Sequence, residues 1–235
     1  MPTQYKKRRS LTVSLLLLGT IVFLSFGNSS LQNQSTWQWQ EISTNDTEQT
    51  FANEALKDIA IKDRGPKTGY SRDRFGNGWA VSQGCDTRNI ILNRDLEDVS
   101  LDEENCYVLS GTLKDPYTGK TIFFKRGIDS GNVQIDHVVA LSDAWQKGAA
   151  KLNDSKREEL ANDPLNLLAV DGPANQQKGD ADAASWLPPN KSFRCQYVAR
   201  QIAVKAIYQL WMTRAEHDAI AAVLQKCPDQ MLPNT

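Results

Sequence analysis

The hydrophobic and polar positions divide this chain into a short apolar run near the start, a polar stretch, and a longer region in which both kinds alternate. Four cations at positions 6–9 precede a mostly apolar run over residues 11–26. Such a pattern is typical of a secretory signal peptide, and the run is short for a membrane-spanning helix, which needs about 20 apolar residues. We predict that residues 1–27 direct export, as a cleaved signal peptide or as a retained N-terminal membrane anchor.

The polar stretch, residues 28–50, is rich in Ser, Thr, Asn and Gln. This composition indicates a flexible spacer. Folded structure is expected from residue 51 onward. It should start with a short amphipathic helix that carries Leu56 and Ile59 on its apolar face and ends by Gly65-Pro66.

Short apolar runs bounded by turn residues predict four strands in the remaining region. They cover residues 106–111, 121–125, 133–141 and 165–170. A turn through Asp115-Pro116 and Gly119 should join the first two strands.

Helical periodicity and capping residues predict four further helices. They are residues 142–152, residues 154–163, one or two turns between Pro173 and Gly179, and a long helix whose apolar stripe runs from Ala199 to Leu210. Ser142 and Asp154 are suitable N-caps for the first two. Strands and helices together predict one α+β domain over residues 51–235.

The composition suits a globular domain but gives no sign of a nucleic-acid partner. Of the 235 residues, 40% are hydrophobic and 23% are charged, and the formal net charge is −1. Residues 1–27 contain four cations and no acids, so the remainder carries a charge of about −5. Nucleic-acid binding usually requires a surplus of Lys and Arg, which this charge does not indicate.

The four cysteines, Cys85, Cys106, Cys195 and Cys227, form no CxxC pair, which argues against a zinc knuckle or a thioredoxin-type site. In an exported chain an even number of cysteines favours disulfides. Three pairings exist, and we favour Cys85 with Cys106 and Cys195 with Cys227 because each bridges one half of the chain locally. Four buried free thiols are the alternative.

One stretch, VQIDHVVALSDAW at residues 133–145, places an acid and an imidazole side by side in an apolar strand. Neighbours on a strand point to opposite faces, but at a strand end Asp136 and His137 can converge beside it. A buried carboxylate needs a cation or hydrogen-bond donors nearby. Asn166 in the next predicted strand and Asn175 in the following helix are polar companions, and Lys178 follows.

These residue types suit metal-assisted hydrolysis. A carboxylate and a carboxamide oxygen are hard donors for one Mg²⁺ or Mn²⁺ ion that keeps several waters. An imidazole nearby can take a proton from water at neutral pH. Together the cation and the base suffice to hydrolyse a phosphodiester, because the cation neutralises the charge that grows on the phosphate.

The chain resembles the HNH (ββα-metal) endonucleases, in the exported branch related to the C-terminal domain of GmrSD-type restriction enzymes. The resemblance lies in IDHVVALSDAW, NDPLNLLAVDGPANQQKGD and YVARQIAVKAIY, with further matches in GCDTRNIILNRDL and DPYTGKTIFFKRG, and it covers about residues 70–227. It implies a metal finger of two strands and a helix, embedded in a larger disulfide-stapled domain. Asparagine at position 175, where some members have a histidine, favours an oxygen-bound metal over zinc.

The resemblance also implies residue roles. Asp136 and Asn175 would be metal ligands, His137 the general base, and Lys178 a phosphate contact. Asn166 would orient the imidazole through a hydrogen bond to its other nitrogen. Each residue also has a plain structural reading, as a strand-end, turn or surface residue.

Arg88 and Arg126 are candidate substrate-binding residues. With Lys147 and Lys178 they would form a local basic rim around the metal, which would reconcile DNA binding with the acidic net charge. His217 lies among acidic residues, and no role is predicted for it.

The predicted function is a secreted or extracytoplasmic, Mg²⁺-dependent HNH endonuclease of the periplasm or cell surface. Its substrate would be DNA, with RNA as a further substrate, and no obligate protein partner is expected. Two alternatives stay open. One is a non-catalytic secreted or cell-surface binding protein that uses the finger as a scaffold, and the other is a metal phosphoesterase acting on a small phosphodiester.

Overall fold

The computed structural model describes residues 50–127 and 129–233, which adopt the mixed α+β fold that the sequence predicts. The predicted export segment, residues 1–27, and the predicted spacer up to residue 49 lie outside this described part. Within it, no helix is both long and apolar enough to cross a membrane.

The described part contains both long and short helices. The α-helices are α1 (Ala52–Asp58), α2 (Thr87–Asp95), α3 (Leu141–Gln146), α4 (Asp154–Asn162), α5 (Gly172–Lys178), α6 (Arg194–Ile207) and α7 (Arg214–Leu224). The short 3-10 helices are η1 (Arg72–Phe75), η2 (Ser130–Asn132), η3 (Ala149–Lys151) and η4 (Lys191–Phe193). The strands are β1 (Val81–Ser82), β2 (Cys85–Asp86), β3 (Leu96–Leu101), β4 (Val108–Lys114), β5 (Thr121–Lys125), β6 (Val133–His137) and β7 (Leu167–Asp171).

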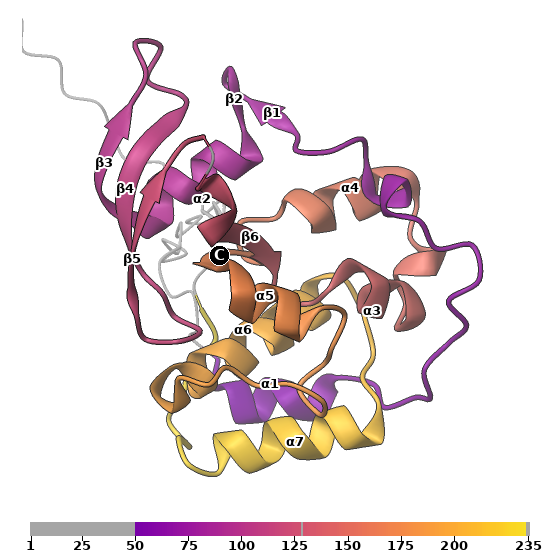
Figure 1. Cartoon of the computed structure of the whole chain (residues 1–235). Helices are drawn as coiled ribbons and strands as arrows, with labels where there is room; N and C mark the ends of the chain where they lie inside the picture. The colour runs from indigo at the N-terminus through magenta and orange to yellow at the C-terminus, as the bar shows by residue number, and fades with distance from the viewer. Residues whose placement is uncertain (1–49, 128, 234–235) are drawn as a thin grey trace, which may run out of the picture. The chain divides into compact units, whose positions relative to one another are not determined.

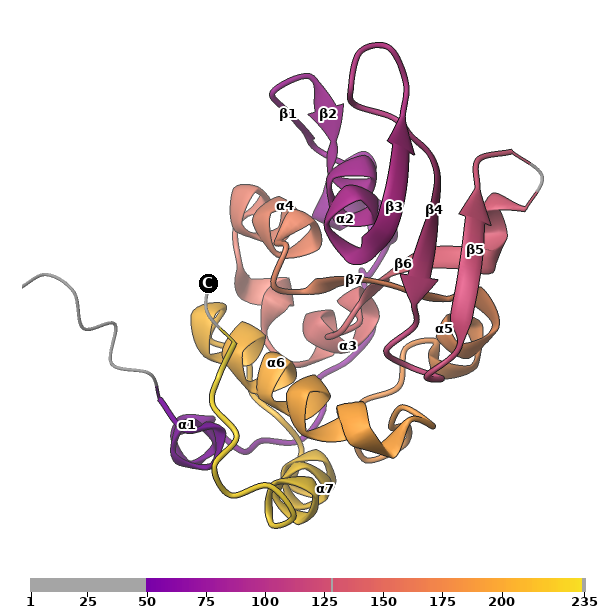
Figure 2. The same cartoon turned by 90° about the vertical axis from the view of Figure 1, so that its left-hand side faces the viewer.

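The strands of the described part pair antiparallel in three small sheets. Strands β3, β4 and β5 form the largest sheet in that order, while β1 pairs with β2 and β6 pairs with β7. Helix α2 lies beside the three-stranded sheet, and α1, α6 and α7 gather at the opposite end of the domain (Figures 1 and 2). The β6–β7 pair lies between these two groups.

The β6–β7 pair is buried on both faces. Leu168 and Val170 pack with α1, α6 and α7, whereas Val133 and Ala169 pack with α2 and the three-stranded sheet. Successive residues on a strand point to opposite faces, so burial of both faces explains why the run LLAV contains no polar residue. The end of β6 is consequently supported from two sides.

Helix α5 follows β7 directly and completes a unit of two strands and a helix. Asp171 caps the helix, because its side chain accepts a hydrogen bond from the Ala174 amide at 2.8 Å. Gly172 lies against the segment before β6, where a Cβ atom would be 2.2 Å from the carbonyl oxygen of Gly131. Only glycine allows this approach, which places α5 beside β6.

Both disulfides have the pairing that the sequence favoured. Cys85 pairs with Cys106 and Cys195 pairs with Cys227, which leaves no free cysteine in the described part. The sequence separations are 21 and 32 residues. Loops of this size correspond to a stabilisation of about 3 to 4 kcal/mol each in the chain-entropy model.

Two predicted N-caps are wrong. Helix α3 begins after Ala140 without a side-chain cap, so Ser142 lies buried inside the helix. Helix α4 is capped by Asn153, whose side chain accepts a hydrogen bond from the Lys156 amide, and Asp154 is the first helical residue. Several residues near each start are able to cap, and packing decides among them.

Two segments are shorter than predicted. The strand expected to reach residue 141 ends at His137. The helix expected to reach residue 152 ends at Gln146, because Gly148 has a φ of 129° and turns the chain out of the helix.

Candidate active site

The last two residues of β6 lie on the wall of a cavity of about 260 Å³. Asp136 and His137 share this cavity with Asn175 from α5 and Arg72 from η1. A smaller cavity of about 130 Å³ also borders His137 and Arg72, together with Trp79. The fold therefore brings three of the predicted site residues together from a strand end and a helix.

Asp136 is buried, and both of its carboxylate oxygens are engaged. Oδ1 accepts a hydrogen bond from Lys178 Nζ at 2.9 Å, and Oδ2 accepts one from the Tyr117 hydroxyl. Burial raises the pKa of Asp136 above its ordinary value, while Lys178 and Tyr117 oppose the rise. Both of these neighbours are themselves buried, so they hold the carboxylate in one orientation.

Lys178 has a different place from the one predicted. Its side chain is fully enclosed, and Nζ donates to Asp136 and, at 2.8 Å, to the carbonyl oxygen of His137. In this arrangement the ammonium group is surrounded by protein and is not placed to contact a phosphate. Lys178 instead joins α5 to the end of β6.

The hydrogen bond of His137 identifies its tautomer. Nε2 lies 2.9 Å from the carbonyl oxygen of Ala161. A carbonyl oxygen only accepts, so Nε2 carries the hydrogen and Nδ1 keeps a free lone pair. The Trp79 ring stacks on the imidazole, with centroids 5.8 Å apart and an interplanar angle of 9°. His137 is thus held in the form that can accept a proton at Nδ1.

Burial lowers the pKa of His137 to about 3, against the opposing effect of its bond to Ala161. The positive charges of Arg72 and Lys178 act in the same direction as burial. The imidazole of the metal-free protein is therefore neutral throughout the neutral pH range.

We expect this low pKa to appear in two measurements on the metal-free protein. The His137 ring signal in NMR should stay unchanged from pH 8 to pH 5. An unfolded histidine has a pKa of about 6.5, so below that pH the unfolded state takes up the proton first and stability is lost as pH falls toward 3. Wild type should lose about 3 kcal/mol more than His137→Asn between pH 7 and pH 4.

The urea unfolding free energies of the two proteins at both pH values provide this comparison. Because the other titrating groups are common to both proteins, the difference isolates the imidazole. A His137 signal that titrates near pH 6.5, or equal acid sensitivity of the two proteins, would contradict the assignment.

Asn166 does not contact the imidazole, in contrast to the predicted role. Its Oδ1 accepts a hydrogen bond from the Val139 amide at 2.8 Å, and its Nδ2 donates to the carbonyl oxygens of Val139 and Leu160. The Ala161 carbonyl orients His137 instead. Asn166 therefore contacts Leu160, the residue before Ala161, and it affects the position of the imidazole only through this neighbour.

Asn175 is placed to offer an oxygen to a ligand. Its Nδ2 donates to Gln134 Oε1 at 2.9 Å, which leaves the carboxamide Oδ1 for another partner. Gln134, Asn175 and Asp136 all border the larger cavity, and carboxylate and carboxamide oxygens are donor types that a hard cation accepts. Within residues 50–127 and 129–233, no three His, Cys, Asp or Glu side chains form a metal-binding group.

Comparison with known proteins identifies the family of this chain. Residues 86–223 match the family model of the GmrSD restriction endonucleases, C-terminal domain. The chain belongs to this family. A protein of Arthroderma benhamiae (strain ATCC MYA-4681 / CBS 112371), named "Uncharacterized secreted protein", is 40% identical over 178 residues, which cover 75% of this chain and 84% of the relative.

In this GmrSD-family domain, Arg88 and Arg126 lie away from the two cavities that border His137. Arg126 donates to the Val108 carbonyl at 2.8 Å and to the Asn89 side chain. The Arg88 guanidinium lies 5.8 Å from the centre of the Phe124 ring. The structure therefore does not support the predicted basic rim around Asp136.

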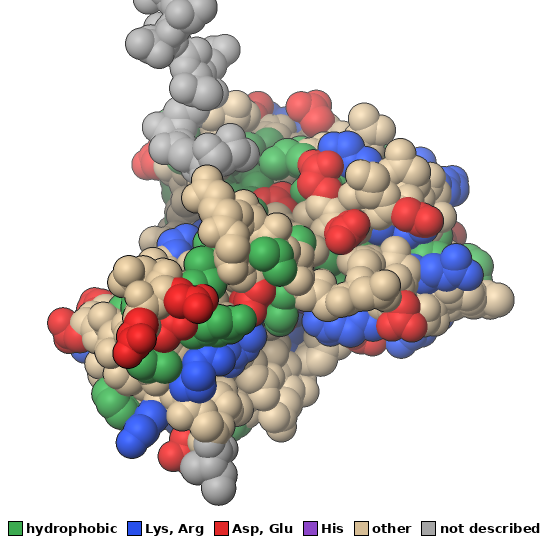
Figure 3. All heavy atoms as spheres, turned by 90° about the horizontal axis from the view of Figure 1, so that it is seen from above, with side chains coloured by type: hydrophobic (Ala, Val, Ile, Leu, Met, Phe, Trp, Pro, Cys, Tyr) green, Lys and Arg blue, Asp and Glu red, His purple; other side chains and the backbone are tan. Residues whose placement is uncertain are grey.

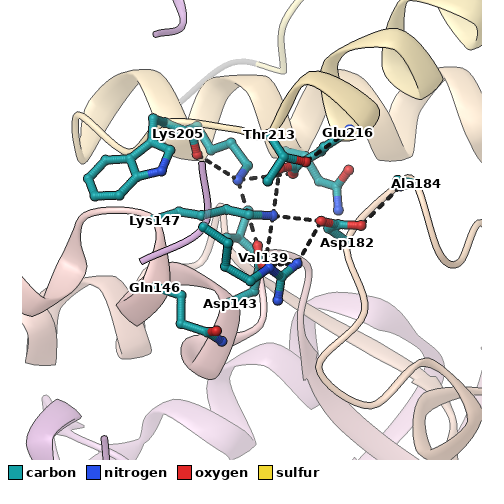
Figure 4. Close-up of polar contacts among 12 residues, drawn as sticks. Val139, Asp143, Gln146, Lys147, Asp182, Ala184, Lys205, Thr213 and Glu216 are labelled. Atoms are coloured by element: carbon teal, nitrogen blue, oxygen red, sulfur yellow. Dashed lines mark hydrogen bonds and ion pairs between the residues drawn. The ribbon is translucent and has the colours of Figure 1, made fainter. Parts of the chain in front are cut away.

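Lys147, the fourth residue of that predicted rim, is buried in a cluster of six charged side chains (Figure 4). Five members of this buried charge cluster are buried, namely Asp143, Lys147, Asp182, Lys205 and Glu216, and the sixth, Arg64, has a side chain that is 37% exposed. Lys147 Nζ lies 2.7 Å from Asp143, 2.7 Å from Asp182 and 2.6 Å from Glu216. Burial lowers the pKa of Lys147, but Asp143 and Glu216 outweigh it and raise the pKa above its ordinary value.

Four residues of this candidate site escaped the sequence analysis: Arg72, Trp79, Tyr117 and Ala161. All lie far from Asp136 and His137 in sequence, and they meet the two residues only through the fold. One signal was present in the sequence, because SRDRFGNGWA combines cations, aromatic residues and glycines in ten positions. That signal did not indicate which of its residues would reach the site.

Proposed function

We propose that this GmrSD-family domain is an endonuclease that hydrolyses phosphodiester bonds of DNA, with RNA as a further substrate, by water that His137 activates. The state of His137 carries the proposal. Nε2 donates its hydrogen to the Ala161 carbonyl, which leaves Nδ1 with a free lone pair. The imidazole ring borders the cavity that Asp136 and Asn175 also line. Membership in a restriction-endonuclease domain family supports a nucleic-acid substrate.

In the proposed reaction Nδ1 of His137 takes a proton from water while the water oxygen attacks phosphorus and the bond to the leaving oxygen breaks. The Ala161 carbonyl keeps accepting from Nε2 and stabilises the imidazolium that forms. A pKa of about 3 makes the free imidazole a weak base. An anionic phosphate beside the ring raises this pKa, so base strength increases when substrate binds.

The proposal includes one divalent cation, Mg²⁺ or alternatively Mn²⁺, held by the Asp136 carboxylate and the Asn175 carboxamide oxygen and otherwise by water. When bound, such an ion neutralises negative charge on the phosphate and on the leaving oxygen. Lys178 already contacts Asp136 Oδ1, so an entering cation competes with an ammonium group for this carboxylate.

Cleavage of supercoiled plasmid by the oxidised protein tests the metal dependence. We expect nicking with Mg²⁺ or Mn²⁺, none with EDTA, and a rate about 10²-fold lower for Asp136→Asn and Asn175→Ala. Asp180→Asn is the matched control, because Asp180 borders the same cavity but is exposed and pairs with Lys67 at 3.1 Å. Cleavage that EDTA leaves unchanged would refute the metal-dependent mechanism.

A non-catalytic secreted or cell-surface binding protein is the second candidate. Engagement of both Asp136 oxygens by Lys178 and Tyr117 favours it, because the carboxylate is already satisfied. Folded, oxidised protein that cleaves neither plasmid nor a chromogenic phosphodiester would support this candidate. Cleavage of the chromogenic diester alone would instead indicate a phosphoesterase acting on small substrates.

We place the protein outside the cytoplasm, as a secreted, periplasmic or cell-surface protein. The two disulfides suit an oxidising compartment, and the similar Arthroderma benhamiae protein is named as secreted. Residues 1–27 would act as a cleaved signal peptide or as an N-terminal membrane anchor.

A further inference from the structure

Phosphate binding in this domain calls for a cation close to the site. On the face of the described residues shown in Figure 3, Lys and Arg side chains are interspersed with Asp and Glu. Lys147 and Lys178, which the sequence suggested for this role, are both enclosed by protein groups. The phosphate contact must therefore come from a side chain that reaches the cavity beside His137.

Helix η1 presents such a side chain and is firmly anchored. Phe75 at its end is 1% exposed, and its ring packs 6.2 Å from the Tyr70 ring and 6.3 Å from the Trp145 ring. The guanidinium of Arg157 donates to the carbonyl oxygen of Arg74 at 2.7 Å. These contacts place the backbone of η1 beside α4, next to the residue whose carbonyl holds His137.

Arg72 is the first residue of η1, and it borders both cavities that flank His137. Its side chain is exposed, and within residues 50–127 and 129–233 no hydrogen bond or ion pair engages its guanidinium. Its positive charge also contributes to the low pKa of His137. Within the described residues, Arg72 is therefore an unpaired cation that lines the same cavities as the proposed base, His137.

We propose that Arg72 binds the phosphodiester group and holds it in the cavity beside His137. This inference rests on the proposed nuclease function. A guanidinium offers parallel N–H donors that match two phosphate oxygens, and it stays charged at every working pH. Placed there, Arg72 also stabilises the negative charge that increases on these oxygens during attack by water.

The test compares Arg72→Ala and Arg72→Lys with Arg74→Ala. Arg74 belongs to the same helical turn, but it borders a different cavity, lined by Asp73, Asp154 and Glu158. With Mg²⁺ or Mn²⁺ present, Arg72→Ala is expected to lower kcat/KM about 10²- to 10³-fold on both plasmid DNA and bis(p-nitrophenyl) phosphate. Arg72→Lys should recover part of the loss, and Arg74→Ala should resemble wild type.

A binding measurement separates this inference from the proposed nuclease function. Inorganic phosphate is titrated into wild type, Arg72→Ala and Arg74→Ala while the NMR signals of His137 and Trp79 are followed, after thermal unfolding has shown that each variant is folded. Phosphate should shift these signals in wild type and Arg74→Ala and have at least tenfold weaker affinity for Arg72→Ala.

Each combined result decides one question. If wild type cleaves DNA but Arg72→Ala matches Arg74→Ala in both cleavage and phosphate affinity, the role of Arg72 is refuted and the nuclease remains. If wild type cleaves nothing but binds phosphate through Arg72, the nuclease is refuted and the phosphate site remains. If Arg72→Ala does not fold, Arg72→Lys decides, because unchanged kcat/KM and phosphate affinity in a folded lysine variant would refute a bidentate phosphate contact.

Discussion

Replacing His137 with alanine is expected to lower phosphodiester cleavage by about 10²- to 10⁴-fold, the usual contribution of a positioned general base. The variant removes Nδ1 of the imidazole, which carries a free lone pair on a ring that borders the cavity. Asp136 and Asn175 keep their contacts to Lys178 and Gln134, so cation binding should persist. The loss should therefore appear in kcat rather than in the concentration of Mg²⁺ needed.

His137→Asn is a second variant that removes the base but keeps a polar side chain. An asparagine side chain keeps a polar carboxamide at about the place of the near half of the imidazole ring, but it has no base at neutral pH. Both variants should show this loss in the plasmid assay at saturating Mg²⁺ or Mn²⁺. His217→Ala is the control, since His217 lies on α7 and contacts Asp218.

Residual activity of His137→Asn within tenfold of wild type would exclude His137 as the base. Another group would then have to activate the water, and the proposed mechanism would be refuted. Loss of activity in His217→Ala as well would instead indicate a general defect in the preparations.

Lys147→Met is expected to reduce the free energy of unfolding by about 3 to 5 kcal/mol, the cost of breaking a buried ion pair by removing one partner. Lys147 contacts three carboxylates of the buried charge cluster and is 0% exposed. Its removal leaves three buried acids with two cations. Because the cluster joins α3, α6 and α7, we expect loss of cooperative packing among these helices rather than a local change.

Urea denaturation of the oxidised protein measures this effect, and Lys156→Met is the matched control. Lys156 pairs with Glu159 at 2.8 Å on the exposed surface of α4, with its side chain 54% exposed. Exposed ion pairs contribute about 0 to 1 kcal/mol, so the control should be close to wild type. Equal losses in both variants would show that burial does not make the cluster structurally important.

Turn-forming residues mark both ends of the elements that the sequence predicted best. Strand β5 matches its prediction at both ends, because Gly119 and the Arg126-Gly127 pair bound a run of β-branched and aromatic residues. Helix α5 also lies where Pro173 and Gly179 indicated. In both cases the information lies within a few residues of the element.

Helix α2 shows why other elements were missed. Thr87 and Asn89 are buried in it beside Ile91 and Leu92, so polar residues interrupt its apolar stripe. Asn89 is buried at low cost because its side chain bonds Asp86, the Val108 amide and Arg126. Such partners are supplied by other segments, and periodicity alone cannot reveal them.

In the candidate site, too, some features could be predicted from the sequence and others could not. Asp136, His137 and Asn175 were selected from residue type and spacing, and the fold places them on one cavity. In the structure Lys178 and Asn166 are engaged by protein groups, and spacing does not predict these partners.

The sequence by itself determined the mixed α+β class and the strand, strand and helix that carry the site, since these depend on local pattern and turn chemistry. It favoured the disulfide pairing that the structure shows without excluding the others. Only the tertiary structure decided which charges are available to a ligand. Lys178 meets Asp136 across 42 residues and Lys147 meets Glu216 across 69, whereas Arg72 reaches the cavity with its guanidinium unengaged in the described part. The physical reason is that burial and pairing of a charge depend on segments brought together by packing, which no local pattern encodes.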